Sequence, residues 1–171
     1  QCTSIRVPVA TFEPNRAQSR CLNHNQDLDV TIATPRPTDE KHLLFKRYLQ
    51  VRHDRQMSDD WESFCDFLYC SPIRTREVMY RLDGALVGVG ILDLEPEAAS
   101  TVYCYFDPDL TDRSLGTFNI LWTIDYCRSK SIPHVYLGYY VGSCQQMSYK
   151  INFRPCELLS EEDCWEPAPA P

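Results

Sequence analysis

The chain has 171 residues, of which 43% are hydrophobic, and a formal net charge of −7 at pH 7. The length is that of one large domain, and the apolar share is ordinary for a globular core. The acidic balance excludes a protein that coats nucleic acid over its whole surface. We find neither a signal-peptide pattern nor an apolar run of membrane-spanning length, so we expect a cytoplasmic protein with no membrane partner.

The charge is nevertheless uneven along the chain. Residues 1–58 hold nine lysine or arginine residues against six acidic ones, whereas the rest holds eight against eighteen. A surface that contacts RNA phosphates would therefore be local and N-terminal, although solvated helix faces explain the same charges equally well. The candidate RNA-binding residues are Arg16, Arg20, Lys46, Arg47, Arg52 and His53.

The chain contains nine cysteines, and no two of them have the spacing of a CxxC pair. A disulfide scaffold is unexpected at this size, because so much of the sequence is ordinary core. We expect most of the cysteines to be reduced and to act as small buried apolar side chains. We predict no metal site.

The N-terminal part predicts a strand, a helix and a second strand, over residues 4–9, 14–22 and 29–33. Pro8 suggests that the first strand lies at an edge of its sheet, because proline has no backbone N–H to donate. Asn15 is the expected cap of the helix.

Two longer helices are predicted next, over residues 38–53 and 59–69. Apolar residues recur in both at helical spacing. Thr38 and Ser58 are the expected N-terminal caps.

Residues 75–94 predict a β-hairpin, because Asp83-Gly84 is a strong two-residue turn between two apolar runs. Gly88 and Gly90 interrupt the return strand. They indicate a bulge or a position where another part of the backbone approaches closely.

Residues 100–137 form the unit around which the chain is organised. A strand over 100–106 and a helix over about 115–129 are followed by a strand at 134–137, and Pro133 prevents the helix from continuing. The unit is long enough for a right-handed crossover between neighbouring parallel strands.

The remaining sequence predicts a short helix, a last strand over 156–159 and a flexible proline-rich tail over 161–171. The order of the elements predicts an α+β fold, in which helices flank a mixed β-sheet of about five to seven strands.

Two segments stand where open α/β sheets place ligands, at the carboxyl ends of the two strands of this unit. The first is Arg113-Ser114-Leu115-Gly116-Thr117 at the mouth of the helix, where exposed backbone N–H groups favour an anion. The second segment begins at Gly138 and is rich in tyrosine, glycine and serine.

The element order and the R-x-x-G-x loop at 113–117 resemble the acyltransferase fold of the GNAT superfamily. In that superfamily an R/Q-x-x-G-x-G/A loop holds the pyrophosphate of acetyl-CoA. Here the second glycine position is Phe118 or Asn119, which disfavours a CoA site. An acyl-CoA-dependent N-acetyltransferase is therefore an alternative interpretation.

A larger set of motifs extends over nearly the whole chain. It comprises Ser4-Ile5-Arg6, Arg47-Tyr48, Phe106-Asp107-Pro108, Arg113 to Thr117, Tyr136 to Tyr140, Ser143, Met147, Tyr149-Lys150 and Phe153-Arg154-Pro155. In this order and spacing the motifs resemble the aminoacyl-tRNA–protein transferases of N-degron tagging. The compact length is similar to the bacterial branch, which moves leucine from leucyl-tRNA onto proteins that begin with Asp or Glu. The arginyl-tRNA branch is the alternative.

The resemblance implies a GNAT-like transferase domain over residues 34–160, without a cofactor. It also implies that residues 1–33 are the remnant of an N-terminal cysteine-containing region, which this chain enters at Cys2. The implied substrate-binding residues are Arg113, Ser114, Leu115, Gly116, Thr117, Tyr136, Gly138, Ser143 and Met147. The implied tRNA-binding residues are Arg16, Arg20, Arg47, Arg52 and His53.

Aminoacyl transfer begins from an activated ester, so the enzyme mainly positions an amine, removes a proton and stabilises an oxyanion. Tyr139, Tyr149 and Lys150 are the candidate catalytic residues, because they supply hydroxyl and ammonium donors. The two tyrosines are equally well explained as core residues with bonded hydroxyls.

An acidic recipient also requires a cation, because a carboxylate that leaves water needs a charge-assisted partner. The candidate cations are Arg76, Arg81, Arg113, Lys150 and Arg154. A third interpretation is a non-catalytic module that binds acidic N-termini.

Overall fold

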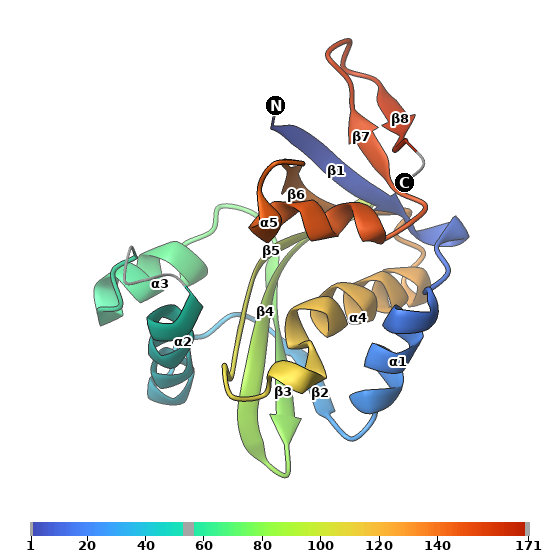
Figure 1. Cartoon of the computed structure of the whole chain (residues 1–171). Coiled ribbons are helices and arrows are strands. Elements are labelled where there is room, and N and C mark those ends of the chain that lie inside the picture. Colours follow the sequence, from blue (N-terminus) through green and yellow to red (C-terminus); the bar gives the residue numbers. More distant parts are fainter. Residues whose placement is uncertain (1, 53–56, 170–171) are drawn as a thin grey trace.

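The computed structural model describes residues 2–52 and 57–169, without the side chains of Arg52, Gln145 and Gln146. The described residues form one eight-stranded sheet in the order β2-β3-β4-β5-β6-β1-β7-β8 (Figure 1). Every neighbouring pair is antiparallel except β5 and β6, which run parallel as predicted.

The strands are β1 Thr3–Pro8, β2 Asp29–Ala33, β3 Thr75–Leu82, β4 Ala85–Glu95, β5 Ala98–Phe106, β6 His134–Tyr140, β7 Glu157–Leu159 and β8 Trp165–Pro167. The helices are α1 Arg16–His24, α2 Asp39–Arg52, α3 Trp61–Tyr69, α4 Leu115–Ser129 and α5 Gln145–Ser148, with short 3₁₀ turns η1 Val9–Thr11, η2 Thr111–Arg113 and η3 Tyr149–Asn152.

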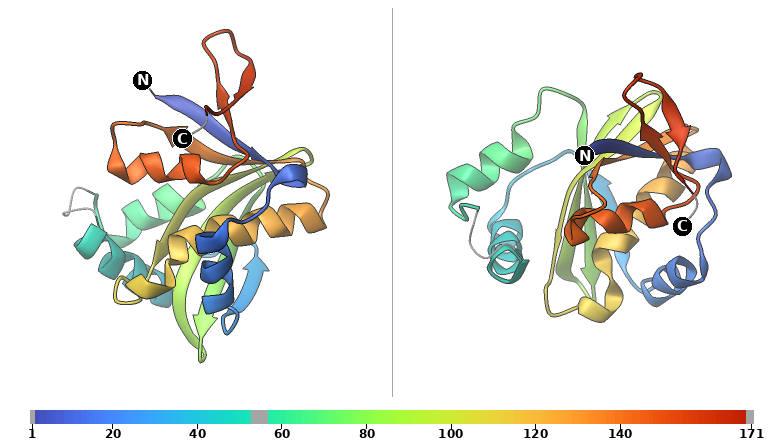
Figure 2. Two further views of the ribbon diagram at one scale, coloured as in Figure 1. Left: turned by 45° about the vertical axis from the view of Figure 1, so that its right-hand side comes forward. Right: turned by 45° about the horizontal axis from the view of Figure 1, so that its top comes forward.

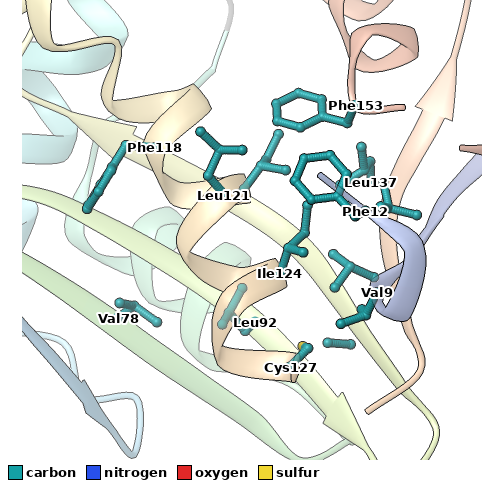
Figure 3. Packing of buried hydrophobic residues seen from close by; sticks show 14 of the residues in the cluster. Val9, Phe12, Val78, Leu92, Phe118, Leu121, Ile124, Cys127, Leu137 and Phe153 are labelled. Carbon is teal, nitrogen blue, oxygen red and sulfur yellow. The ribbon is translucent and has the colours of Figure 1, made fainter. Parts of the chain in front are cut away.

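Helices cover both faces of the sheet, so the molecule has three layers. Figure 2 shows α1 and α4 on one face and α2 and α3 on the other. On the first face, Leu121 and Ile124 of α4 pack with Phe12, Leu137 and Phe153 (Figure 3). On the second face the core is aromatic, because Phe45, Phe64 and Tyr105 pack edge-on or tilted at ring-centre distances of 5.2–6.4 Å.

The helix caps follow local chemistry, with one correction. Asn15 caps α1 as predicted, and its side-chain oxygen accepts the N–H groups of Ala17 and Gln18 at 2.9 and 3.0 Å. The predicted Ser58 cap of α3 is wrong. The helix begins at Trp61, so Asp60 is the cap: its carboxylate accepts the N–H of Ser63 at 2.9 Å, and the hydroxyl of Ser58 donates to the same carboxylate.

The first strand lies inside the sheet, so the edge position suggested by Pro8 is wrong. Strand β1 pairs with β6 on one side and β7 on the other. Pro8 is the last residue of the strand, and β7 reaches only Ile5 and Arg6. The missing N–H of Pro8 therefore interrupts no bond to β7.

The C-terminal residues add more strands than the five to seven that we expected. Strands β7 and β8 form a hairpin at the end of the sheet. Arg154 holds the chain beyond β8, because its guanidinium donates to the carbonyls of Ala168 and Pro169 at 3.3 and 2.6 Å. The ring of Trp165 lies over the guanidinium of Arg6, at 4.2 Å.

The cysteines depart from the expectation of mostly buried thiols. All nine are free, but only Cys127 and Cys156 are buried.

The predicted hairpin turn is confirmed, since Asp83 and Gly84 have φ angles of +49° and +83°. A close approach does occur at Gly90, but it is made by a side chain and not by the backbone that we predicted. A Cβ atom on Gly90 would lie 2.0 Å from the side-chain oxygen of Asn119 in α4. That oxygen also accepts a 2.8 Å hydrogen bond from the hydroxyl of Tyr80, so α4 is held at one depth over the sheet.

A buried ion pair joins α2 to the sheet. The Lys41 ammonium contacts a carboxylate oxygen of Glu77 in β3, and both side chains are at most 5% exposed. Lys41 also donates to the carbonyl of Arg36 at 2.8 Å. The second carboxylate oxygen of Glu77 has no partner among the described residues. The pair therefore depends on Lys41 to balance a charge that water does not reach.

Lys41→Met should lower the free energy of unfolding by about 3–5 kcal/mol, because it leaves the Glu77 carboxylate buried without a cation. The double variant Lys41→Met with Glu77→Leu should recover most of the loss. Arg81→Met is the matched control. Its bidentate pair with Glu40 also joins α2 to β3, but it is more exposed, and its loss should cost about 0–1 kcal/mol. Urea unfolding measures all three variants, and a Lys41→Met variant as stable as the wild type would contradict the prediction.

Candidate functional site

The parallel strands β5 and β6 separate soon after they begin to pair. Within the described chain their register covers only Ala98 to Ser100 against His134 to Tyr136. A hydrogen bond of 3.2 Å from the hydroxyl of Thr101 to the carbonyl of Tyr136 marks the end of this contact. Both strands continue beyond it, to Phe106 and Tyr140. The sheet thus opens at the carboxyl ends of its parallel strands, where we predicted the site.

Three of the predicted residues meet at the end of β6. Gly138 has a φ of +79°, and a Cβ atom there would lie 3.6 Å from the Nζ of Lys150. That Nζ donates to the carbonyl of Tyr139 at 2.9 Å. The side chain of Tyr139 is 56% exposed. The left-handed turn at Gly138 and the ammonium of Lys150 therefore lie side by side at the end of β6.

Tyr149 precedes Lys150 and lies close enough to β5 to be affected by Cys104. Burial raises the pKa of the Tyr149 hydroxyl, and Cys104 acts in the same direction. Burial likewise raises the pKa of Cys104 itself to about 12, so this thiol stays protonated at neutral pH. No hydrogen bond to the hydroxyls of Tyr139 and Tyr149 is present among the described residues. The ring of Tyr149 also packs edge-on against Phe153 at 6.3 Å, so the catalytic role of the two tyrosines stays a prediction.

Burial lowers the pKa of Lys150, although the nearby thiols of Cys2 and Cys144 oppose this shift. The ammonium is partly withdrawn from water, so it gains more from a carboxylate partner than an exposed lysine would.

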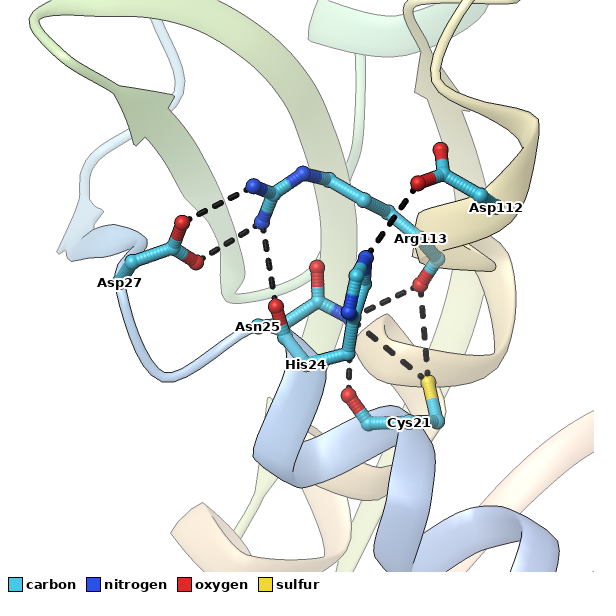
Figure 4. A network of polar contacts seen from close by, with 6 residues as sticks. All are labelled: Cys21, His24, Asn25, Asp27, Asp112 and Arg113. Carbon is cyan, nitrogen blue, oxygen red and sulfur yellow. Dashed lines mark hydrogen bonds and ion pairs between the residues drawn. The ribbon is translucent and has the colours of Figure 1, made fainter.

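Arg113 contributes to the fold of its loop. Figure 4 shows its guanidinium extended toward Asp27, whose two oxygens it binds at 2.8 and 2.9 Å. It also donates to the carbonyl of His24 at 3.2 Å, and its side chain is 14% exposed. This ion pair lowers the pKa of the Asp27 carboxyl. The backbone of Arg113 is held as well, because its carbonyl accepts the side-chain amide of Asn25 at 2.8 Å.

The first turn of α4 follows directly. Ser114 adopts a left-handed φ of +51°, and no side chain caps the helix. Leu115 is fully buried, backbone included, so the structure exposes no atom of this predicted substrate residue to a ligand. Gly116 lies against the ring of Phe106, which a Cβ atom would meet at 3.4 Å. The N–H groups of this turn, including Thr117, remain suited to an anion.

The remaining predicted substrate residues do not form one group. The Tyr136 hydroxyl accepts from Arg6 at 3.2 Å, and its ring packs edge-on against Trp165. Ser143 is exposed in the turn before α5, and Met147 is partly buried within it.

The predicted RNA-binding residues also separate. Arg16 and Arg20 are exposed on α1 without an ion-pair partner in the described chain, and Arg20 lines an open hollow of about 700 Å³ beside His24 and Ser114. Lys46, also proposed, is partly buried. Arg47 instead binds Asp107 and Asp109. The side chain of Arg52 and all of His53 lie outside the described residues.

The cations proposed to bind an acidic recipient are mostly occupied. Arg81 binds Glu40 at 2.6 and 2.9 Å, Arg154 binds backbone carbonyls, and Arg113 binds Asp27. Arg76 donates only to the carbonyl of its neighbour Thr75. Lys150 is the one of these cations that lies at the end of β6.

Sequence reasoning missed the partners that occupy the arginines. Asp27 and Arg113 are 86 positions apart, and Arg47 and Asp107 are 60 apart, so no local pattern connects them. In the described chain, no three His, Cys, Asp or Glu residues are grouped as a metal site would require.

Residues 40–160 match the family model described as "Arginine-tRNA-protein transferase, C terminus". The chain belongs to this transferase family. It is 42% identical over 164 residues to an aspartate/glutamate leucyltransferase of Stenotrophomonas maltophilia and covers 65% of that protein. It is 42% identical over 160 residues to the enzyme of the same name from Pseudomonas fluorescens and covers 68% of it. The matches span 91% and 92% of this chain, and they confirm the family that the motifs indicated.

Solved structures confirm the GNAT-like acyltransferase fold of this family member. A tandem GNAT protein from the clavulanic acid biosynthesis pathway has a TM-score of 0.55 at 16% identity, over 88% of this chain and 47% of that one. FemX has a TM-score of 0.53 at 10% identity, over 80% and 52%. At such identities the likeness concerns the fold alone. None of the described helices has the length and apolar character needed to cross a bilayer.

Gly138→Ala should abolish the aminoacyl transfer that is proposed below, because it forces a side chain into a left-handed backbone beside Lys150. The matched control is Gly84→Ala. Gly84 has a similar φ of +83° with nothing within 4 Å, in a hairpin turn at the far end of β4. Both changes should cost about 1–2 kcal/mol of stability. Thermal unfolding and transfer rates compare them, and equal activity of the two variants would show that the end of β6 is not the site.

Proposed function

We propose that the chain transfers leucine from leucyl-tRNA to proteins whose first residue is Asp or Glu. The chain spans 65% of the Stenotrophomonas relative that carries this name. The observation that supports it best is the position of Lys150 beside Gly138, where β5 and β6 separate. Because the donor is a charged tRNA, we propose a cytoplasmic site of action.

The reaction needs positioning more than a covalent nucleophile. The α-amine of the recipient attacks the ester carbonyl, a C–N bond forms and an oxyanion develops. The ester C–O bond then breaks, the proton of the amine is lost, and the 3′-oxygen of the terminal tRNA ribose leaves with a proton. The hydroxyls of Tyr139 and Tyr149 are available as donors to the developing charge, because neither has a partner among the described residues.

The recipient's acidic side chain needs a cation, and Lys150 fits this role. The candidate arginines Arg81, Arg113 and Arg154 already have carboxylate or carbonyl partners. Among the described residues the Lys150 ammonium has one bond, to the Tyr139 carbonyl, so two of its three N–H groups remain to offer. Arg16 and Arg20 on α1 are proposed to contact tRNA phosphates, since they are exposed and unpaired in the described chain.

Peptides that begin with Glu should accept leucine at least about 10²-fold faster than peptides that begin with Gln, because the amide leaves the site's cation unpaired. The measurement compares Glu, Asp, Gln and Ala peptides with labelled leucyl-tRNA. Arginyl-tRNA and acetyl-CoA serve as competing donors. Equal rates for Glu and Gln would contradict acidic recognition, whereas faster transfer of arginine or acetate would identify a different donor.

Transfer to a Glu peptide should decrease as the pH rises through the lowered pKa of Lys150, because the ammonium that pairs with the carboxylate is lost. Lys150→Arg keeps its charge at any pH used and should move this decrease to higher pH. Lys150→Met should lose the preference for Glu over Gln. Initial rates from pH 6 to 10 test this in a background in which Cys2 and Cys144 are replaced by Ser, because both act on the pKa of Lys150. An unchanged pH profile in Lys150→Arg would exclude the role.

A further inference from the structure

Arg47 connects α2 to the turn that follows β5. Its Nη2 atom lies 3.0 Å from Asp107 Oδ1 and 2.9 Å from Asp109 Oδ2, and its Nη1 atom lies 3.2 Å from Asp107 Oδ2. Asp107 is itself fixed. Its N–H donates to the carbonyl of Val87 at 2.8 Å, and its Oδ1 atom accepts the N–H of Asp109 at 3.0 Å. The guanidinium thus closes a turn that is already bonded to β4.

The next residue of α2 contacts the same place. The ring of Tyr48 packs edge-on against Phe106, the last residue of β5, at 5.1 Å. Phe106 in turn lies against Gly116 in the first turn of α4. Neighbouring residues of α2 therefore contact both sides of the junction between β5 and its loop, and a continuous packing path reaches α4.

The loop over residues 107–114 is held at its other end as well. Arg113 binds Asp27, which follows α1 on the opposite face of the sheet. The loop is thus fixed from both helical layers. It ends at Ser114, whose left-handed backbone sets the direction of the first N–H groups of α4.

The surroundings of Arg47 do not suit a phosphate. Two carboxylates contact one guanidinium, so a phosphate would meet a site that is already negative. The side chain of Arg47 is 44% exposed and that of Asp109 is 81% exposed. Such a pair contributes little to stability in water. Its effect is therefore expected in the geometry of the loop.

We propose that Arg47 is a positioning residue for aminoacyl transfer: it holds the 107–114 loop, and through it the first turn of α4, in the geometry that receives the donor end. The inference rests on the proposed function. It differs from the role in tRNA binding that the sequence suggested for Arg47.

Arg47→Met should lower kcat about 10- to 100-fold, the effect of a small misplacement near a reacting centre. The KM for leucyl-tRNA and the salt dependence of tRNA binding should stay unchanged. Amide hydrogen exchange in residues 109–116 should become faster. The exchanged pair Arg47→Asp with Asp107→Arg should recover part of kcat and of the protection, because it restores the same contact with reversed charges.

Two variants serve as references. Arg81→Met removes another bidentate pair of α2 and should leave kcat unchanged. Arg20→Gln should make the slope of log K against log salt shallower by about one unit or slightly less, as expected for a lost phosphate contact. A shallower slope in Arg47→Met with kcat intact would overturn the proposal, as would unchanged hydrogen exchange. If wild type transfers no amino acid, the proposed function fails, whereas the exchange data still decide whether Arg47 holds the loop.

Discussion

The brief parallel contact between β5 and β6 is the constraint on which the rest of the molecule depends. Three residue pairs join the strands, and beyond them each strand needs other support. Strand β6 obtains it from β1, which makes an N-terminal segment part of the sheet, and from η3, whose Lys150 bonds to the carbonyl of Tyr139. Strand β5 obtains it from β4 and from the ion-paired loop that leads into α4. An opening in a sheet is stable only when both of its sides are supported in this way.

More arginines of this protein hold its loops and strands together than the sequence analysis predicted. Arg47 and Arg113 fix the loop before α4, Arg154 holds the segment after β8, and Arg6 lies between Glu157 and the ring of Trp165. A planar guanidinium can bind two oxygens and an aromatic face together, so it suits such junctions better than lysine does. Lys150, by contrast, lies at the opening of the sheet, and burial lowers its pKa.

The sequence predicts those features whose causes lie within a few residues. The Asn15 cap, the Asp83-Gly84 turn and the helix from Leu115 are local, and the structure confirms them. Which of two nearby polar residues caps a helix is harder to predict: the sequence predicts that Ser58 caps α3, but Asp60 does. The candidate site is predicted as a region, because strand ends attract ligands, but its internal pairings are not. Whether Arg113 meets a ligand or Asp27 depends on how α1 packs beside α4, which only the folded chain determines.

The contact between Gly90 and Asn119 makes two distant positions interdependent in sequence. A larger residue at position 90 displaces the amide that Tyr80 bonds, so it is compatible with this fold only when residue 119 becomes smaller and the tyrosine loses its hydroxyl. Three coordinated substitutions are an improbable evolutionary step. Diversification among related chains should therefore avoid this point of the sheet.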